Sequence, residues 1–485
     1  MNLVLLLGYG AVIAVASFWG LVRLERTGRS VSTVLLVMWL LVIESALYEN
    51  PNLVPNGLFH PGIGVDPNPD DEVIDYAISF RLVDLIVPIA LAARIYARGI
   101  PPRIRTSSVW MLALFTWLLG AALLGFYNGN AAGLITFELK VIVYLGVLGL
   151  AATVPADAYT ERPGLYRLIY GSAVIATALI LLDELDLTFS LDAPLLPLNN
   201  VGNVGADAAS IFVALGMLAL ALGAFRAQQR LRLFAAAGPL LVVPALAGQR
   251  AAILGLGVSL LVLMVGMILA GRRLQATATE FALLALLAVG LATLPPVARL
   301  ALGAPSAHLP FAAAVEETFT SQAKKQSAES RLNQWRKARE LIEERPVTGW
   351  GLGKTYTHYD PGHREFFETD FTHNVVTDLL LRTGVIGVIL FLVAIALALV
   401  DGWGAWRRQS DDLAAALALA SVAIVAGLLA RGMVESLFEK FRLATLLGIA
   451  LGIIGSVAVA PARARYRERA LRAEPAWSSK ISSVH

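Results

Sequence analysis

The chain repeats one pattern from end to end: an apolar stretch of about 20 residues followed by a short polar connection. A stretch of that length crosses the hydrocarbon of a bilayer as a helix. We predict spans at residues 2–22, 31–47, 82–98, 107–127, 134–154, 165–182, 206–225, 233–247, 251–270, 279–297, 373–400, 412–430 and 442–460. The sequence therefore predicts an all-α polytopic membrane protein of about 12–13 transmembrane helices.

The composition supports this fold class. Hydrophobic residues make up 57% and charged residues 15% of the 485 residues, whereas average soluble domains carry about 25% charged residues. A chain with so few charges cannot cover its surface for contact with water, and we infer that lipid covers most of that surface instead. The chain has no cysteine, which excludes disulfides, thiolate metal sites and cysteine nucleophiles. The basic residues gather in separate connections, which argues against a nucleic-acid partner.

Arginine residues mark every second connection between the predicted spans. They are Arg23, Arg26, Arg29, Arg94, Arg98, Arg103, Arg105, Arg162, Arg167, Arg226, Arg230, Arg232, Arg272, Arg273, Arg407 and Arg408. The intervening connections have almost no Lys or Arg. Basic connections stay in the cytoplasm, so we expect a cytoplasmic C-terminus, an N-terminus outside, and a long extracytoplasmic loop.

We expect four regions along the chain. They are N-terminal transmembrane helices (1–298), an extracytoplasmic loop with amphipathic helices (299–372), C-terminal transmembrane helices (373–460) and a basic cytoplasmic tail (461–485). Long loops escape the positive-inside rule, so the many charges of the loop do not contradict this topology.

Arg250 departs from this pattern, and Arg331 differs from the other charges of its own helix. Arg250 lies at the expected outer start of a span, where an arginine either reaches lipid head groups or binds phosphate in a two-pronged way. Arg331 and Trp335 lie one turn apart on a predicted amphipathic helix. Ser330 suits the start of that helix and Pro346 its end. Most charges on such a helix are solvated, but Arg331 lies beside the apolar stripe.

A glycine-rich segment, residues 346–354, follows this helix and is called the glycine turn below. Glycine lets the backbone take tight turns and approach a neighbour closely. The glycines do not have the spacing of a nucleotide-binding loop, and no predicted strand precedes them. We therefore predict a rigid turn that returns the chain to the membrane.

His373 comes directly before the next apolar stretch. We expect it in the first turn of a helix that Thr372 or Asp370 caps. The partial positive charge of a helix N-terminus disfavours imidazolium, so the ring should be neutral near pH 7 and able to accept a proton. The alternative is a satisfied polar residue at the membrane interface.

These residues occur in an order that resembles the O-antigen ligase family, which also contains O-antigen polymerases. The ordered set is Arg250, Arg331, Trp335, Ala338, Pro346, Gly349, Gly351, Gly353, His373, Asn374, Arg382, Gly384 and Gly387. The resemblance implies a GT-C type glycosyltransferase fold. It also implies metal-independent transfer of a glycan from undecaprenyl diphosphate to an acceptor hydroxyl, on the outer face of the cytoplasmic (inner) membrane.

The resemblance suggests a role for each matching residue. Arg250 and Arg331 would bind the donor diphosphate and stabilise its charge as it leaves, and His373 would act as a base toward the acceptor hydroxyl. The candidates for substrate binding are Asn374, Trp335, Lys354, Arg382, Gly351 and Gly353. No residue is assigned to a metal or another cofactor. An extra N-terminal span and Gln249 depart from the family and argue against lipid A as the acceptor.

The expected partners are a polyprenyl-diphosphate-linked glycan donor, a glycan, lipid or cell-wall acceptor, and membrane lipids. A polysaccharide polymerase that uses the same donor is the first alternative, and the single large outer loop favours the ligase. A lipid-linked glycan flippase or transporter is the second. Transporters carry charges or broken helices at mid-membrane, whereas the candidate charges here lie at the outer boundary.

Overall fold

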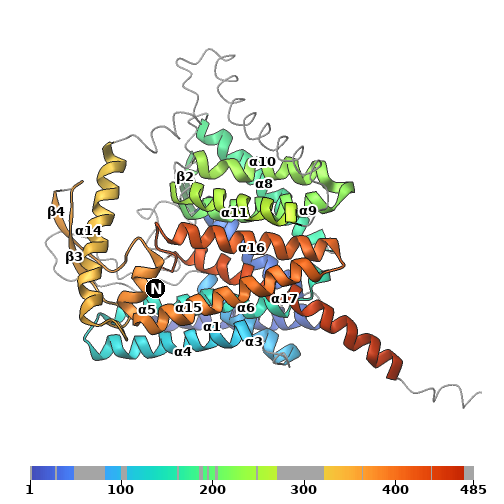
Figure 1. The fold of residues 1–485 in the computed structure, drawn as a ribbon, viewed down its shortest axis with the longest axis horizontal. Coiled ribbons are helices and arrows are strands. Elements are labelled where there is room, and N and C mark those ends of the chain that lie inside the picture. Colours follow the sequence, from blue (N-terminus) through green and yellow to red (C-terminus); the bar gives the residue numbers. More distant parts are fainter. Residues whose placement is uncertain are drawn as a thin grey trace, which may run out of the picture.

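The computed structural model describes most of the chain. The described residues are 3–27, 30–47, 82–99, 106–160, 163–184, 189–193, 196–201, 206–246, 250–269, 322–362, 364–438 and 440–473. The helices are α1 (Leu3–Arg26), α2 (Ser30–Leu47), α3 (Leu82–Arg98), α4 (Thr106–Tyr127), α5 (Ala132–Leu139), α6 (Val141–Thr153), α7 (Ala156–Thr160), α8 (Pro163–Glu184), α9 (Ala206–Phe225), η2 (Ala227–Gln229), α10 (Arg230–Leu246), α11 (Arg250–Leu269), α14 (Gln322–Glu344), α15 (Val375–Arg408), α16 (Asp412–Gly432) and α17 (Phe441–Ala473). Figure 1 shows how they pack into a bundle.

Each predicted span corresponds to a helix, or to the pair α5 and α6, except 279–297, which lies outside the described residues. Within the part of the chain that the structure describes, seven helical segments are long and apolar enough to cross a membrane. Two shorter apolar helices cover Val31–Ile43 and Ala209–Phe225. The protein is therefore a polytopic helical membrane protein, as its hydropathy predicts.

The centre of the bundle is formed by α16 and α17, which are the most deeply buried of these segments. At its periphery, α4 and α11 expose large apolar side chains such as Leu123 and Leu261. Lipid contact accounts for such exposure, because a bilayer stabilises apolar surface that water would not.

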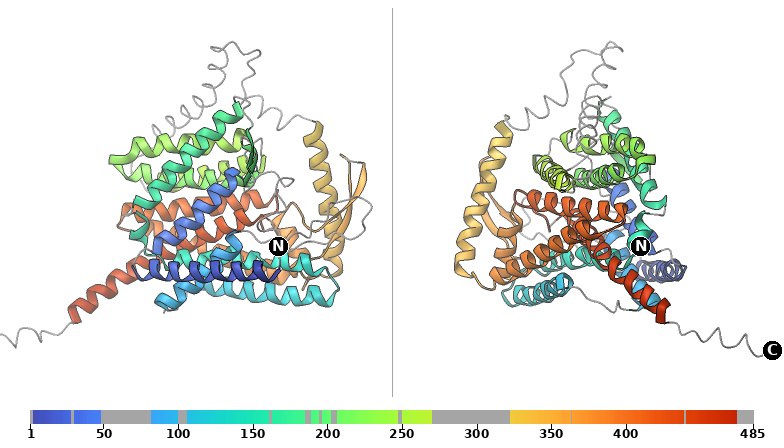
Figure 2. Two further views of the ribbon diagram at one scale, coloured as in Figure 1. Left: turned by 180° about the vertical axis from the view of Figure 1, so that it is seen from behind. Right: turned by 45° about the vertical axis from the view of Figure 1, so that its right-hand side comes forward.

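The two ends of the bundle differ. Helix α14 lies across one end, and α17 leaves the bundle at the opposite end (Figures 1 and 2). α15 begins beside α14 and runs to Arg407 and Arg408. At this far end Arg94 pairs with Glu25 and donates a hydrogen bond of 2.6 Å to the Thr153 carbonyl. Arginine-rich connections therefore lie at the end opposite α14.

Two antiparallel hairpins depart from the all-helical prediction: β1 (Phe189–Ala193) with β2 (Leu196–Val201), and β3 (Tyr356–Asp360) with β4 (Glu365–Thr369). The second packs against α14, where Ser330 Oγ donates to Asp360 Oδ2 at 3.1 Å. Ser330 is thus inside α14, which starts at Gln322, so its prediction as the helix cap is wrong. The last part of the loop is thus a hairpin, and β3 alternates buried and exposed residues with a period of two, as a strand does.

Candidate functional site

α15 is interrupted near its start at Gly384, where φ is 65° and ψ is −169°. Glycine is essentially the only residue that adopts this combination. A regular helix would join the Val385 amide to the Leu381 carbonyl. Here the Val385 amide donates to the Pro346 carbonyl at 2.9 Å, and the Leu381 carbonyl accepts from the Trp350 amide at 2.8 Å. The glycine turn therefore fills the gap in α15.

The glycines of this turn are packed against the bundle. φ is positive at Gly349 (69°), Gly351 (83°) and Gly353 (75°). A Cβ on Gly351 would lie 2.2 Å from the Gly125 nitrogen in α4, and one on Gly353 would lie 2.7 Å from Ile135 in α5. The tight turn is confirmed, but the hairpin of β3 and β4 follows it, so the turn does not return the chain directly to the membrane. The close approach of Gly351 and Gly353 is to protein, and a role in substrate binding remains a prediction.

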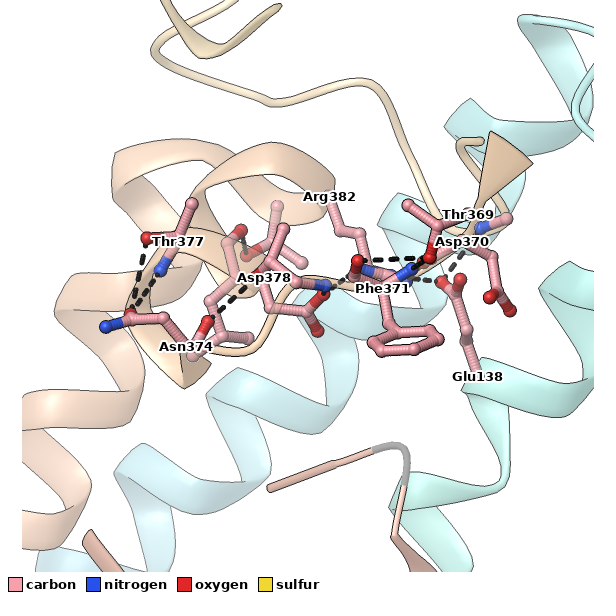
Figure 3. A network of polar contacts seen from close by, with 12 residues as sticks. Glu138, Thr369, Asp370, Phe371, Asn374, Thr377, Asp378 and Arg382 are labelled. Atoms are coloured by element: carbon pink, nitrogen blue, oxygen red, sulfur yellow. Dashed lines mark hydrogen bonds and ion pairs between the residues drawn. The ribbon is translucent and has the colours of Figure 1, made fainter. Parts of the chain in front are cut away.

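Arg382 lies at the centre of a buried polar network (Figure 3). Its Nε is 2.6 Å from Glu138 Oε2, and the guanidinium also contacts the Asp378 carboxylate and the Asp370 carbonyl. The Gly353 amide donates to the same Glu138 oxygen at 2.8 Å. One guanidinium thus joins α5, α15, the glycine turn and the segment before α15. These contacts favour a positioning role for Arg382, which the sequence suggested as a diphosphate ligand.

Asn374 is the N-cap of α15. Its Oδ1 accepts hydrogen bonds of 2.9 and 3.0 Å from two backbone amides of the first turn. The prediction that Thr372 or Asp370 caps this helix is therefore wrong. The Asn374 Nδ2 donates to the Met433 carbonyl at 2.8 Å. Both ends of the amide bind protein backbone, which favours a structural role; substrate binding by Asn374 remains a prediction.

The segment that carries His373 is held on both sides. The Tyr356 hydroxyl donates to the Phe371 carbonyl at 2.9 Å, and the Thr372 amide donates to Asp378 Oδ1 at 3.2 Å. The Phe371 ring packs edge-on against the His373 imidazole, with 5.1 Å between ring centroids. These contacts fix the imidazole just before α15 begins.

His373 carries a neutral imidazole at neutral pH. Burial, and then the positive charge of Arg331, lower its pKa from 6.5 to about 4, while the Glu435 carboxylate acts in the opposite direction. The predicted neutral state agrees, but burial is its first cause and not a helix terminus. Within the described residues the buried Nδ1 atom of His373 has no hydrogen-bond partner. It is thus a candidate proton acceptor.

Arg331 extends from α14 to the bundle. One terminal nitrogen donates to the Val434 carbonyl at 3.0 Å, in the connection between α16 and α17. Trp335, one turn further along α14, is half-buried, and its indole nitrogen has no hydrogen-bond partner among the described residues. Arg331 therefore reaches the bundle from α14, and Trp335 lies one turn along the same face, as their spacing predicted.

The connection between α16 and α17 holds charged residues that the sequence reasoning missed. Glu435 Oε2 is 2.7 Å from the Arg431 guanidinium, and Oε1 is 2.8 Å from Lys440 Nζ. Burial raises the pKa of Glu435, but Arg431 and Lys440 outweigh it and lower the pKa to about 2. The signal was available in the sequence, because basic residues stand in a connection that the positive-inside rule expects to be poor in them.

Arg250 is the first residue of α11, and the structure describes its backbone only. One helical turn later Gly255 packs on α16: a Cβ there would lie 2.9 Å from the Gly427 carbonyl and 3.5 Å from Arg431 Cβ. The start of α11 therefore lies beside the end of α16. This puts Arg250 at the same end of the bundle as Arg331 and His373.

Lys354 lies at the end of the glycine turn, with its ammonium 4.5 Å from the centre of the Trp350 ring. The Arg345 guanidinium lies 4.1 Å from the same ring and donates to Asn128 Oδ1 at 2.8 Å. The cation–π contacts stabilise the turn itself, and the hydrogen bond to Asn128 ties it to the residue that follows α4. They account for Lys354 structurally, and its contact with a diphosphate remains a prediction.

The described residues contain no group of three or more His, Asp or Glu side chains placed to hold a metal ion. What gathers at the α14 end is instead a neutral imidazole with cations around it. Such a group can accept a proton while fixed positive charge meets an anion.

Comparison with known proteins agrees with this arrangement. Residues 235–392 match the family model described as O-antigen ligase. This range includes the start of α11, α14, the glycine turn, His373 and the kink of α15. A search of curated proteins gave no match. The family match confirms the resemblance carried by the ordered motifs.

Proposed function

We propose that this member of the O-antigen ligase superfamily is a membrane glycosyltransferase that transfers a glycan from a polyprenyl diphosphate to an acceptor hydroxyl. Its site would lie at the α14 end of the bundle. Because the arginine-rich connections lie at the other end, this end faces the outside of the cytoplasmic membrane. The polyprenyl tail stays in lipid while its diphosphate reaches the bundle end.

The transfer needs one bond formed and one broken. The acceptor oxygen attacks the anomeric carbon of the donor sugar, and the bond from that carbon to the phosphate oxygen breaks. Its electron pair stays on the diphosphate, where Arg331 and Arg250 offset the new charge. The acceptor proton passes to Nδ1 of His373.

Donor binding would also strengthen the base. In the free protein burial, and then the charge of Arg331, lower the pKa of His373. A diphosphate that binds Arg331 cancels part of that charge, so the pKa of His373 rises, while the effect of burial remains. The imidazole then becomes a better proton acceptor only when the donor is present. This order limits the chance that water is activated in the empty site.

The observation that carries this proposal is the buried Nδ1 atom of His373, which lacks a partner among the described residues and lies within the electrostatic reach of Arg331. Buried polar atoms are normally hydrogen-bonded, so an exception needs an explanation. A substrate hydroxyl supplies one. The family match over the same residues supports the same reaction class.

The test is transfer by purified protein in proteoliposomes loaded with a polyprenyl-diphosphate glycan and a panel of acceptors. We expect release of the carrier diphosphate, and loss of release in His373→Ala and Arg331→Ala. Arg336→Ala, on the exposed face of α14, is the matched control and keeps the parent rate. If the parent releases no carrier with any acceptor, the proposal is wrong. The length of the product separates a ligase from a polymerase.

A further inference from the structure

In the described part of the connection between α16 and α17, Arg431, Glu435 and Lys440 form an ion cluster. The Glu435 carboxylate accepts from Arg431 at 2.7 Å on one oxygen and lies 2.8 Å from Lys440 Nζ on the other. Both cations therefore contact the same carboxylate. The Arg431 side chain is only 1% exposed, whereas that of Lys440 is 23% exposed. Of the two cations, Lys440 is thus the one that an entering anion can reach.

The same connection holds two elements of the proposed site. The Met433 carbonyl accepts from Asn374, next to His373, and the Val434 carbonyl accepts from Arg331. Consecutive residues of one connection therefore bind α15 and α14. The position of Lys440 is consequently fixed relative to both.

Lys440 also acts on the site through its charge. Arg331 and Lys440 both lower the pKa of His373, whereas Glu435 raises it. Arg331 reaches the Val434 carbonyl, and Lys440 pairs with Glu435, the next residue. The two cations come from different elements, but neighbouring residues of one connection hold both of them.

We propose that Lys440 is a further ligand of the donor diphosphate, and that Glu435 positions it. The proposal rests on the proposed function, because it adds a contact to the same donor. A diphosphate carries more than one negative charge, and its departure adds another, so several fixed cations are needed to stabilise it. A lysine suits this place because its compact ammonium ends a flexible stem and can follow the departing phosphate.

Lysine acylation of the intact parent protein tests the contact without any substitution. The protein is treated with an amine-reactive reagent with and without inorganic pyrophosphate, and each lysine is quantified by mass spectrometry. We expect pyrophosphate to slow the labelling of Lys440 about fivefold or more, as burial of a charge-assisted contact does. Lys337 on α14 is the internal control, because it is exposed and pairs with Glu340 at 2.8 Å. Equal labelling of Lys440 at all pyrophosphate concentrations overturns the proposal.

Substitution then tests the role in turnover. We expect Lys440→Met to raise the KM for the polyprenyl-diphosphate donor about tenfold or more, with Lys440→Arg close to the parent and Lys337→Met unchanged. An unchanged donor KM in folded Lys440→Met contradicts the proposal. A parent that releases no carrier would end the proposed function alone, because pyrophosphate protection still decides whether Lys440 is a phosphate ligand.

Discussion

The side-chain amide of Asn374 joins two helices: its oxygen caps α15, and its nitrogen donates to the Met433 carbonyl at 2.8 Å, just after α16. The residue before it is His373, and the residue after Met433 accepts a hydrogen bond from Arg331. The residue next to the proposed base and the proposed diphosphate ligand thus both donate hydrogen bonds to one short connection. A fixed arrangement of this kind lets a site act without reorganising at each turnover.

Substitution of Asn374 separates these two hydrogen bonds. Asn374→Asp keeps an oxygen to cap α15 but loses the donor to Met433, and Asn374→Ala loses both. We expect Asn374→Ala to destabilise the protein by about 1–2 kcal/mol more than Asn374→Asp, because loss of an N-cap side chain has a cost of that size. Thermal unfolding in detergent measures this difference, and kcat should fall in both variants. A parent-like kcat in Asn374→Asp would show that the Met433 contact does not position His373.

Arg331 and Arg336 lie on the same helix with different surroundings. Arg331 reaches the Val434 carbonyl, whereas Arg336 is exposed and, among the described residues, contacts Asn333 on its own helix. We expect Arg331→Ala to lower kcat/KM by about a hundredfold or more, the usual cost of losing an electrostatic stabiliser, and Arg336→Ala to leave it unchanged. Carrier release measures both. Equal effects of the two substitutions would mean that α14 contributes only its overall positive charge and not a specific contact of Arg331.

The pH dependence of stability tests the environment of His373. Its folded pKa of about 4 lies below the ordinary value of 6.5, so the unfolded chain binds the proton more readily between those values. The contribution of His373 to the free energy of unfolding is therefore fully present above about pH 6.5 and is lost as the pH falls toward 4. We expect His373→Asn to reduce the loss of thermal stability between pH 6.5 and 4.5.

His358 also contributes to the loss of stability between pH 6.5 and 4.5. Burial lowers its pKa too, so it adds to the same loss of stability. His358→Asn is therefore the companion variant, and the double variant should have the flattest profile. Glu435, with a pKa of about 2, contributes its loss only at lower pH. An unchanged slope in His373→Asn would show that its imidazole is not buried in the neutral form.

Substitution of Arg382 distinguishes a role in stabilising the fold from a role in binding the donor diphosphate. Arg382→Met would leave Glu138 and Asp378 buried without their cation, which costs about 3–5 kcal/mol. Arg339→Met breaks an exposed pair with Glu343 and should cost at most about 1 kcal/mol. Thermal unfolding in detergent compares the two. If Arg382→Met keeps its stability and loses donor affinity, Arg382 is a diphosphate ligand.

Several features of this protein were predictable because their physical cause is local. Hydropathy identifies spans residue by residue, and each predicted span within the described residues is helical. The order of Arg331, the glycine turn and His373 indicated the family, which the match over residues 235–392 confirms. The spacing of Arg331 and Trp335 likewise placed both on one face of α14.

The tertiary structure decided which distant side chains meet. Glu138 lies in an unremarkable predicted span, yet it forms an ion pair with Arg382. The Asn374 amide that caps α15 also donates to the Met433 carbonyl, which comes from another helix end. Lys440 and Glu435 gain their place near His373 only when α16 and α17 pack beside α15. Sequence by itself determined which segments enter the membrane, since burial in lipid depends on composition along the chain. It did not determine the charge pairing at the end of the bundle, since that depends on how helices far apart in the sequence lie side by side.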